Sequence, residues 1–304
     1  MGGDQRVPSV VRRARIHKSV KIVPNGAFKD RWRLISVEFH DGVEIIEEDA
    51  FNWCLSLRGP IKLLGIKIIK EGAFFSCWGL TGVEFGNQLE TIERHAFSFC
   101  HSIRTITMPH VRTIGKEAFC NCNQLTDLKL PEALETSDEG VFRDCVSLTR
   151  ITLPLKENLI TYDVFNGCTE LTTVNLFEGI HETVASLPLE RWINEMTGEI
   201  NRINEVLPNT DYLQTTQVIR GWVRSVTHQL NHYKAEHQKV LKEATTLLEL
   251  ALWKANLDEN EGGVVEKEGV RTTRGQRKRA RKEISITSGA SIVIKNVVPF
   301  LELK

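Results

Sequence analysis

The sequence predicts an α/β repeat fold: a solenoid of short parallel strands over residues 16–184, followed by an α-helical region over residues 185–257. Two observations predict it. A Phe preceded by Ala or Val recurs seven times, at intervals of 23, 23, 23, 22, 23 and 23 residues. After Phe177 this period stops, and apolar residues recur at steps of three and four. A 23-residue unit is too short to enclose a core, so neighbouring units must stack to bury one.

The seven units agree in several columns. The aligned phenylalanines are Phe28, Phe51, Phe74, Phe97, Phe119, Phe142 and Phe165. Leu or Ile stands six residues after each Phe, and Ile or Val stands five residues before it in every unit except the sixth, which has Ser137. Three residues after the Phe, units two to seven have Cys, whereas unit one has Arg31, as a capping unit would. Stacking such columns gives continuous apolar ridges.

Each unit is expected to contain one clear strand. Stretches such as LTGVEF (80–85) and LTRITL (148–153) end in an apolar–polar alternation typical of a short strand. The I-x-x-x-A-F stretch is expected to turn the chain back through a second short extended segment and a helical turn. Trp32, Trp53 and Trp78 lie near the Phe column and are expected to cover the convex side of the first coils.

The pattern I-G-x-x-A-F-x-x-C-x-x-L-x-x-V/I-x-L, shown best by IGKEAFCNCNQLTDLKLP (114–131), resembles the BspA-like leucine-rich repeat. The resemblance covers residues 16–180, and the opening segment and C-terminal helices are similar to the uncharacterised leucine-rich repeat proteins of diatoms. It implies a leucine-rich repeat solenoid that serves as a binding surface and has no assigned catalytic residues.

Outside the repeats, two amphipathic helices are expected. One runs from Leu189 through Met196 to Val206 and is ended by Pro208, and the second runs from about Gln214 to Asn256. The second helix either packs antiparallel to the first or caps the last repeat, because solenoids need capped ends. Residues 1–15 are interpreted as an N-terminal extension or cap. Residues 258–304 are interpreted as a linker, a basic segment and an apolar C-terminal segment.

No constellation of residues points to an enzyme, a metal site or a cofactor. The sequence has no G-x-S-x-G motif, no phosphate-binding loop and no dinucleotide fingerprint, so a non-catalytic protein without a cofactor is expected. Cys120 and Cys122 lack the second ligand pair of a zinc site, and His228 and His232 lack a third ligand. The cysteine column is better explained as small buried residues in a reducing compartment.

Charge and hydropathy favour an intracellular chain. Lys+Arg and Asp+Glu both number 39, so the formal net charge is zero. No apolar run approaches the roughly 20 residues that cross a bilayer, and no apolar core of a signal peptide is visible near the N-terminus. We therefore expect a cytoplasmic or nuclear location and no membrane span.

The most favoured function is binding of a protein or peptide partner through the strand surface of the solenoid. One outward column differs in charge and size from unit to unit, unlike the core columns. It comprises Glu38, Lys62, Glu84, Thr107, Lys129, Thr152 and Asn175, where Lys62 is aligned by allowing one inserted residue at Gly59-Pro60. A long, shallow polar surface suits a protein partner better than a small metabolite. The alternative is a face that is only solvated.

A basic segment offers a second interpretation. Seven basic residues and no acidic residue occur within positions 271–282: Arg271, Arg274, Arg277, Lys278, Arg279, Arg281 and Lys282. Such a cluster is typical of nuclear import or of contact with nucleic acid. It has no interleaved aromatic residues for base stacking. The alternative is a solvated linker that balances the acidic remainder of the chain.

Overall fold

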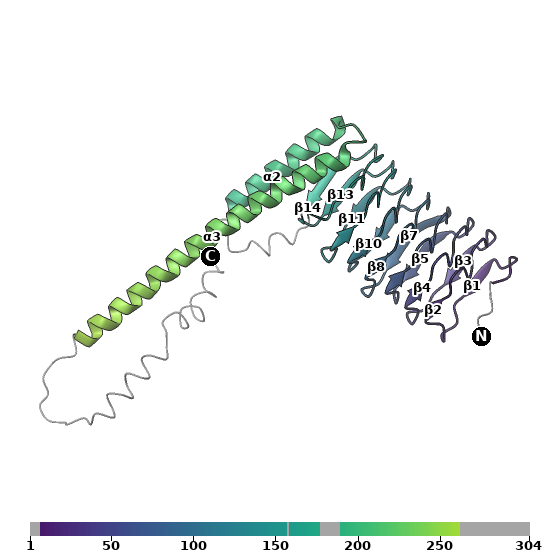
Figure 1. Cartoon of the computed structure of the whole chain (residues 1–304), viewed down its shortest axis with the longest axis horizontal. Helices are drawn as coiled ribbons and strands as arrows, with labels where there is room; N and C mark the ends of the chain where they lie inside the picture. Colours follow the sequence, from purple (N-terminus) through teal and green to yellow (C-terminus); the bar gives the residue numbers. More distant parts are fainter. Residues whose placement is uncertain (1–6, 157, 177–188, 262–304) are drawn as a thin grey trace, which may run out of the picture. The chain divides into compact units, whose positions relative to one another are not determined.

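The computed structural model describes residues 7–156, 158–176 and 189–261. These residues belong to two compact units. The described part of the first unit comprises the solenoid up to residue 176 and residues 193–228, and that of the second comprises residues 189–192 and 229–261. The described part of the first unit forms seven coils, numbered here by the aligned phenylalanines (Figure 1).

Each coil contributes a strand to one face of the solenoid, which we call the strand face. Its strands are β1 Arg13–Arg15, β3 Ser36–Glu38, β5 Gly59–Leu63, β7 Leu80–Phe85, β9 Thr105–Thr107, β11 Asp127–Lys129, β13 Arg150–Leu153 and β14 Thr173–Leu176. They pair in parallel as β1-β3, β5-β7-β9 and β11-β13-β14. β1 shows that the segment expected to be an extension or cap adds a strand to this face.

A second, continuous parallel sheet of two-residue strands runs along another side of the solenoid. It is formed by β2 Ile22–Val23, β4 Ile45–Ile46, β6 Ile68–Ile69, β8 Thr91–Ile92, β10 Thr113–Ile114 and β12 Thr136–Ser137. These strands confirm the second extended segment in coils one to six. The buried residue of each pair is the one that stands five residues before the aligned Phe.

The core of the solenoid is a ladder of stacked phenylalanine rings. Neighbouring rings lie 4.7–6.0 Å apart between centroids, with planes within 12° of parallel. All seven rings are buried. Stacked aromatic pairs add about 0.5–1.5 kcal/mol to the stabilisation that comes from burial of their area. The column seen in the sequence is therefore a continuous apolar contact between coils.

The turn around each Phe is not the helical turn that was expected. In every coil the residues two before and two after the Phe have positive φ, between 54° and 77°. This geometry directs the amides of these two residues and of the Phe towards the next coil. Phe28 N, for example, donates to Ala50 O at 2.7 Å, and the same three hydrogen bonds join every pair of neighbouring coils. A helical turn would direct the same amides along its own axis.

The cysteine column forms a second set of hydrogen bonds between coils. Each Cys donates its thiol proton to the carbonyl oxygen of the Phe in the preceding coil, over 3.1–3.6 Å. The first coil has no preceding coil, and there Arg31 donates through Nε to Val7 O and through Nη1 to Lys29 O at 2.7 Å. Val7 N in turn donates to Ala27 O. Arg31 therefore ties the N-terminal segment to the first coil.

Two helices follow the solenoid. α2 Leu189–Val206 continues into the 3₁₀ turn η1 Leu207–Asn209, and α3 spans Thr215–Glu261. The predicted helices are confirmed, although α3 continues five residues further than expected. Leu207 is buried and Val206 is exposed, so Leu207 belongs to the apolar face in place of Val206.

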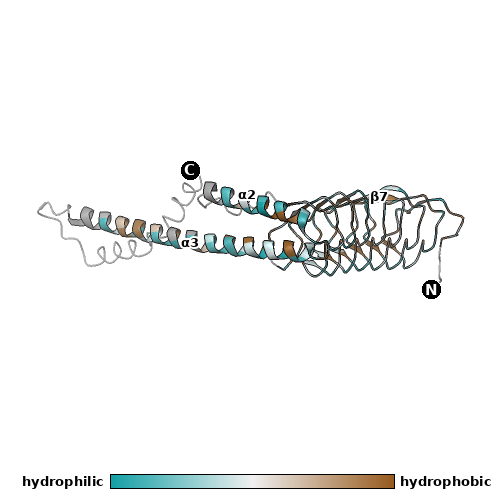
Figure 2. Cartoon of the chain, turned by 90° about the horizontal axis from the view of Figure 1, so that it is seen from above, coloured by the Kyte–Doolittle hydropathy of each residue, from teal (hydrophilic) through white to brown (hydrophobic). Residues whose placement is uncertain are grey.

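Both proposed roles of the helices occur in the first unit. Residues 193–206 and 215–228 lie side by side and run in opposite directions (Figures 1 and 2), and Trp222 Nε1 donates to Glu199 O. The same residues cap the solenoid. Phe165 N donates to Thr216 Oγ1 at 2.8 Å and Val174 N to Asn204 Oδ1 at 2.7 Å. These oxygens take the place of the carbonyls that an eighth coil would supply.

The ladder predicts the effect of removing one ring. Phe119→Ala should lower the free energy of unfolding by about 3–5 kcal/mol, because a fully buried ring leaves a cavity between two neighbouring rings. Urea unfolding followed by circular dichroism measures this. Val146→Ala, at a partly exposed position of the next coil, is the control and should cost less than about 1 kcal/mol. An unchanged midpoint for the Phe119 variant would contradict the ladder.

The hydrogen bond that Thr216 accepts at the end of the solenoid predicts a loss of stability when its oxygen is removed without a change in side-chain volume. Thr216→Val removes the oxygen that accepts from Phe165 N and leaves that buried amide unpaired, which costs about 1–3 kcal/mol. The matched control is Thr246→Val, at an exposed position of the same helix. Equal unfolding midpoints for the two variants would show that Thr216 does not cap the solenoid.

Candidate functional site

The predicted outward column lies in register on the strand face. Lys62 pairs with Glu84 and Glu84 with Thr107, whereas Lys129 pairs with Thr152 and Thr152 with Asn175. The pairing of Lys62 with Glu84 confirms the inserted residue, because the register shifts between Gly59 and Pro60. All seven side chains of the column are exposed or half-buried. The structure therefore registers six of the seven residues in two groups of three, whereas Glu38 pairs with Arg15 of β1.

Ion pairs between neighbouring strands hold part of the charge on this face. Arg15 Nε lies 2.6 Å from Glu38 Oε2, Lys62 Nζ lies 3.0 Å from Glu84 Oε2, and Arg150 Nη1 lies 3.3 Å from Asp127 Oδ1. The hydrogen bond that the Arg15 guanidinium donates to Glu38 raises the pKa of Arg15 above its ordinary value. Exposed pairs of this kind add little to stability. Their main effect is to place charges of both signs at fixed points.

A groove interrupts the strand face between β9 and β11. It has a volume of about 570 Å³. Thr107 and Lys129, both members of the predicted column, line it together with Ile106, Met108 and Pro131. His110 and Glu132 contribute polar groups. The groove thus combines apolar walls with a few polar side chains, which is the usual composition of a binding site.

The groove lies beside the one unit that has 22 residues. Six residues separate Met108, at the end of the β9 segment, from Ile114, whereas seven separate Leu130 from Ser137 in the next coil. The loop of coil four is therefore one residue shorter than its neighbour, and the hollow lies between these two loops. The sequence held this signal in the irregular spacing, but the spacing alone does not reveal a groove.

A smaller hollow of about 180 Å³ accompanies the other short loop. It lies between the loop after β3 and the six-residue step from Leu63 to Ile69, and Phe39, His40 and Lys62 are among its lining residues. Gly65 is essential to this close approach of loops, because a Cβ there would lie 1.9 Å from Asp41 O. Both hollows therefore adjoin residues of the predicted column.

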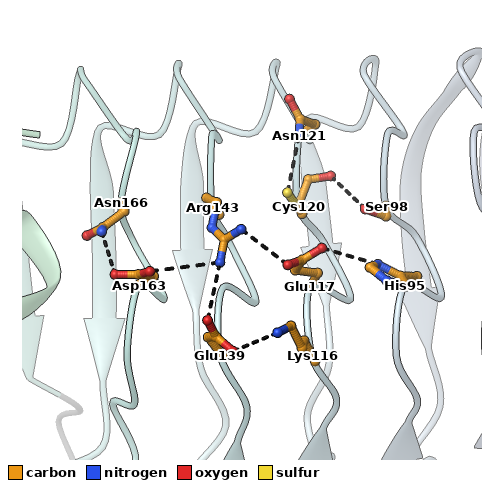
Figure 3. A network of polar contacts seen from close by, with 10 residues as sticks. All are labelled: His95, Ser98, Lys116, Glu117, Cys120, Asn121, Glu139, Arg143, Asp163 and Asn166. Atoms are coloured by element: carbon orange, nitrogen blue, oxygen red, sulfur yellow. Dashed lines mark hydrogen bonds and ion pairs between the residues drawn. The ribbon is translucent and has the colours of Figure 1, made fainter. Parts of the chain in front are cut away.

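The charged residues on another side of the solenoid pair with one another between coils. Figure 3 shows one such network, in which Arg143 lies 3.2 Å from Glu117 and 3.8 Å from Glu139. Lys116 Nζ approaches Glu139 to 2.7 Å, and its hydrogen bond holds the pKa of Glu139 below the ordinary value. His95 lies 3.5 Å from Glu117, and burial lowers the pKa of the imidazole. Most of these contacts join successive coils.

The seven cysteines are all buried free thiols. Burial raises the pKa of Cys54 and Cys100 to about 12, and that of Cys120 to about 11. Thiols with such pKa values are poor nucleophiles and poor metal ligands at neutral pH. Within the described residues, no group of three His, Cys, Asp or Glu side chains is placed to hold a metal ion. The basic segment 271–282 lies outside the described residues.

Comparison with known proteins identifies the family. The family model described as "BspA type Leucine rich repeat region" matches six copies over residues 11–111 and 90–187, which is more than half of the chain. The chain belongs to the BspA-type leucine-rich repeat family. Proteins with this repeat are typically non-enzymatic modules that bind other proteins. A search of curated proteins gives no match.

Solved structures of similar proteins come from bacteria. The leucine-rich repeat protein of T. pallidum is 26% identical, covers 56% of this chain and 77% of its own, and superposes with a TM-score of 0.43. A leucine-rich cell surface protein of Faecalibacterium prausnitzii is 20% identical, with coverages of 55% and 60% and a TM-score of 0.39. Among the described residues, no helix combines the length and the hydropathy needed to cross a membrane.

The buried thiols predict a dependence of stability on alkaline pH. The folded chain keeps the protons of Cys54 and Cys100 up to about pH 12, whereas the ordinary thiol pKa is 9.0. The folded chain then binds more protons than the unfolded chain, so the free energy of unfolding falls as pH rises above 9.0. Urea midpoints measured between pH 7.5 and 10.5 should fall less steeply for Cys100→Ala than for the unaltered chain. Parallel pH profiles would show that Cys100 ionises equally in both states.

Proposed function

We propose that the chain is a non-catalytic module that recognises a protein or peptide partner through the strand face, with the column from Glu38 to Asn175 as the contact surface. The groove between β9 and β11 carries this proposal. It is the place where two members of the column, Thr107 and Lys129, meet buried apolar side chains. A side chain of a partner that enters the groove would bury apolar area. The charged residues of the column would pair with opposite charges of the partner on either side of the groove.

The form of the surface favours a macromolecular partner. The groove lies on a face built from strands of seven coils, so a ligand that fills it also meets the neighbouring strands. Specific protein interfaces bury about 800 Å² on each partner, which is more than a groove of this size supplies alone. The flanking charges, such as the pair Lys62–Glu84, would add selectivity through electrostatic complementarity.

The thiols support an intracellular site of action. Seven buried cysteines without a disulfide suit a reducing compartment. The F. prausnitzii protein is described as a cell surface protein, so the repeat itself does not determine the compartment. Fractionation of cells that express the full chain tests the location. Recovery from the cytoplasmic or nuclear fraction is expected, and recovery from the medium would contradict it.

An exchange of paired charges tests the strand face. The double variant Lys62→Glu with Glu84→Lys keeps the ion pair and the net charge but reverses their order on the face. Folding stability should change by less than about 1 kcal/mol because both side chains are exposed. Affinity for the partner should fall at least tenfold, because misplaced charges at an interface cost several kcal/mol. The measurement is surface plasmon resonance with the partner identified by affinity capture on the unaltered chain.

The matched control exchanges a pair outside the strand face. Glu71→Arg with Arg94→Glu alters two charges that face each other across coils three and four, with similar exposure. This variant should bind the partner as the unaltered chain does. If the control loses binding and the strand-face variant keeps it, the partner binds a different surface and the proposal is wrong.

A further inference from the structure

A second surface of the solenoid carries aromatic side chains at an energetic cost. In the column two residues after the aligned Phe, every residue has positive φ. Five of the seven are small or polar residues, namely Asp30, Ser76, Asn121, Asp144 and Gly167. The other two are Trp53, with a φ of 60°, and Phe99, with a φ of 61°. Left-handed backbone is tolerated by Gly, Asn and Asp and is an outlier for bulky side chains.

These two side chains are only partly buried. Trp53 is 45% exposed and Phe99 is 37% exposed. The neighbouring column, four residues after the Phe, holds Trp32 and Trp78, which are also exposed. The three tryptophans that were expected to cover the convex side of the first coils are therefore each about half exposed. Strained positions that the packing does not explain occur preferentially at functional sites.

Ring contacts link Trp78, Phe99 and His101, whereas Trp32 and Trp53 stand in the same two columns of coils one and two. The Phe99 ring lies 5.4 Å from Phe75 and 6.0 Å from His101, and Trp78 lies 5.9 Å from His101. We define the aromatic edge as Trp32, Trp53, Trp78, Phe99 and His101. The same two columns in coils five to seven hold no aromatic residue. The aromatic edge is thus confined to the first four coils.

The charge beside the aromatic edge is mainly positive, and Asp30, in the same column as Trp53 and Phe99, is the carboxylate that stands in it. The Arg33 guanidinium lies over the Trp32 ring, 5.4 Å from its centre. Arg58 and Arg104 are exposed seven residues after the Phe of coils two and four. At the positions four, five and seven residues after the Phe, coils one to four carry no carboxylate. Trp and Arg together are the residue types most enriched at the energetic centres of protein interfaces.

We infer that the aromatic edge binds an extended, acidic peptide segment of a protein partner, with apolar side chains of the peptide against the rings and its carboxylates against Arg33, Arg58 and Arg104. Neighbouring coils repeat every 4.7–5.0 Å here. Four coils therefore span about 15 Å, which is the length of four or five extended residues. The surface is separate from the column on the strand face.

The experiment selects ligands and then localises them. The full chain is used to select binders from a phage library of random twelve-residue peptides, and the affinity of the selected peptides is measured by fluorescence anisotropy. Selected peptides should be rich in Asp and Glu and should contain aromatic or aliphatic residues. Failure to select any peptide, or selection of basic peptides, would overturn the inference.

The decisive variant is Trp53→Asn with Phe99→Asn, because Asn occupies this column naturally at Asn121. Its urea midpoint should equal or exceed that of the unaltered chain, while peptide affinity falls at least tenfold. A lower midpoint would mean that the two rings serve packing, and the inference would be wrong. Val146→Asn, in the column four residues after the Phe of coil six, is the control and should leave affinity unchanged.

The strand-face variant separates this inference from the proposed function. Lys62→Glu with Glu84→Lys should leave affinity for the selected peptides unchanged. If the peptides instead lose binding in that variant and keep it in the Asn variant, they occupy the strand face. That result would support the proposed function and overturn the aromatic edge.

Discussion

The structure depends on the contact between one coil and the next. Within the solenoid, the ring of each Phe packs against the rings of its neighbours, and three amides around it donate to carbonyls of the following coil. The thiol of each column Cys donates a hydrogen bond to the Phe carbonyl oxygen of the preceding coil. No coil has a core or a complete set of hydrogen bonds by itself. Stability is therefore a property of the array, as expected for repeat proteins.

This dependence explains why the sequence was informative about the fold. Positions that stack on copies of themselves must hold the same kind of residue, so Phe, Ile and Cys columns are visible without any structure. It explains equally why Arg31 departs from the Cys column, since the first coil has no preceding Phe carbonyl and faces Val7. The periodicity of α2 and α3 gave their approximate bounds because each presents one apolar face.

Other features were not available from the sequence. A Thr or Asn in an amphipathic helix carries no sign that it will accept a hydrogen bond from a strand, so Thr216 and Asn204 were not recognised as caps. The positive φ values around each Phe also went unrecognised, because His95, Trp53 and Phe99 stand where Gly, Asn or Asp would indicate that geometry. The groove could be recognised only from the relative positions of two loops in the structure. The 22-residue interval in the sequence marked where it lies. The outward column was found because alternation along a strand fixes which side chains point away from the core.

The two ends of the solenoid have a consequence for how such a chain could change in length. Every internal coil makes the same kinds of bond on both sides, whereas Arg31 at one end and Thr216 with Asn204 at the other make bonds that occur only once. If the gene gained or lost one 23-residue repeat between these two ends, the encoded protein would keep every type of contact. The terminal segments therefore act as fixed closures on an interior of adjustable size, and binding surfaces could be lengthened without a new fold having to arise.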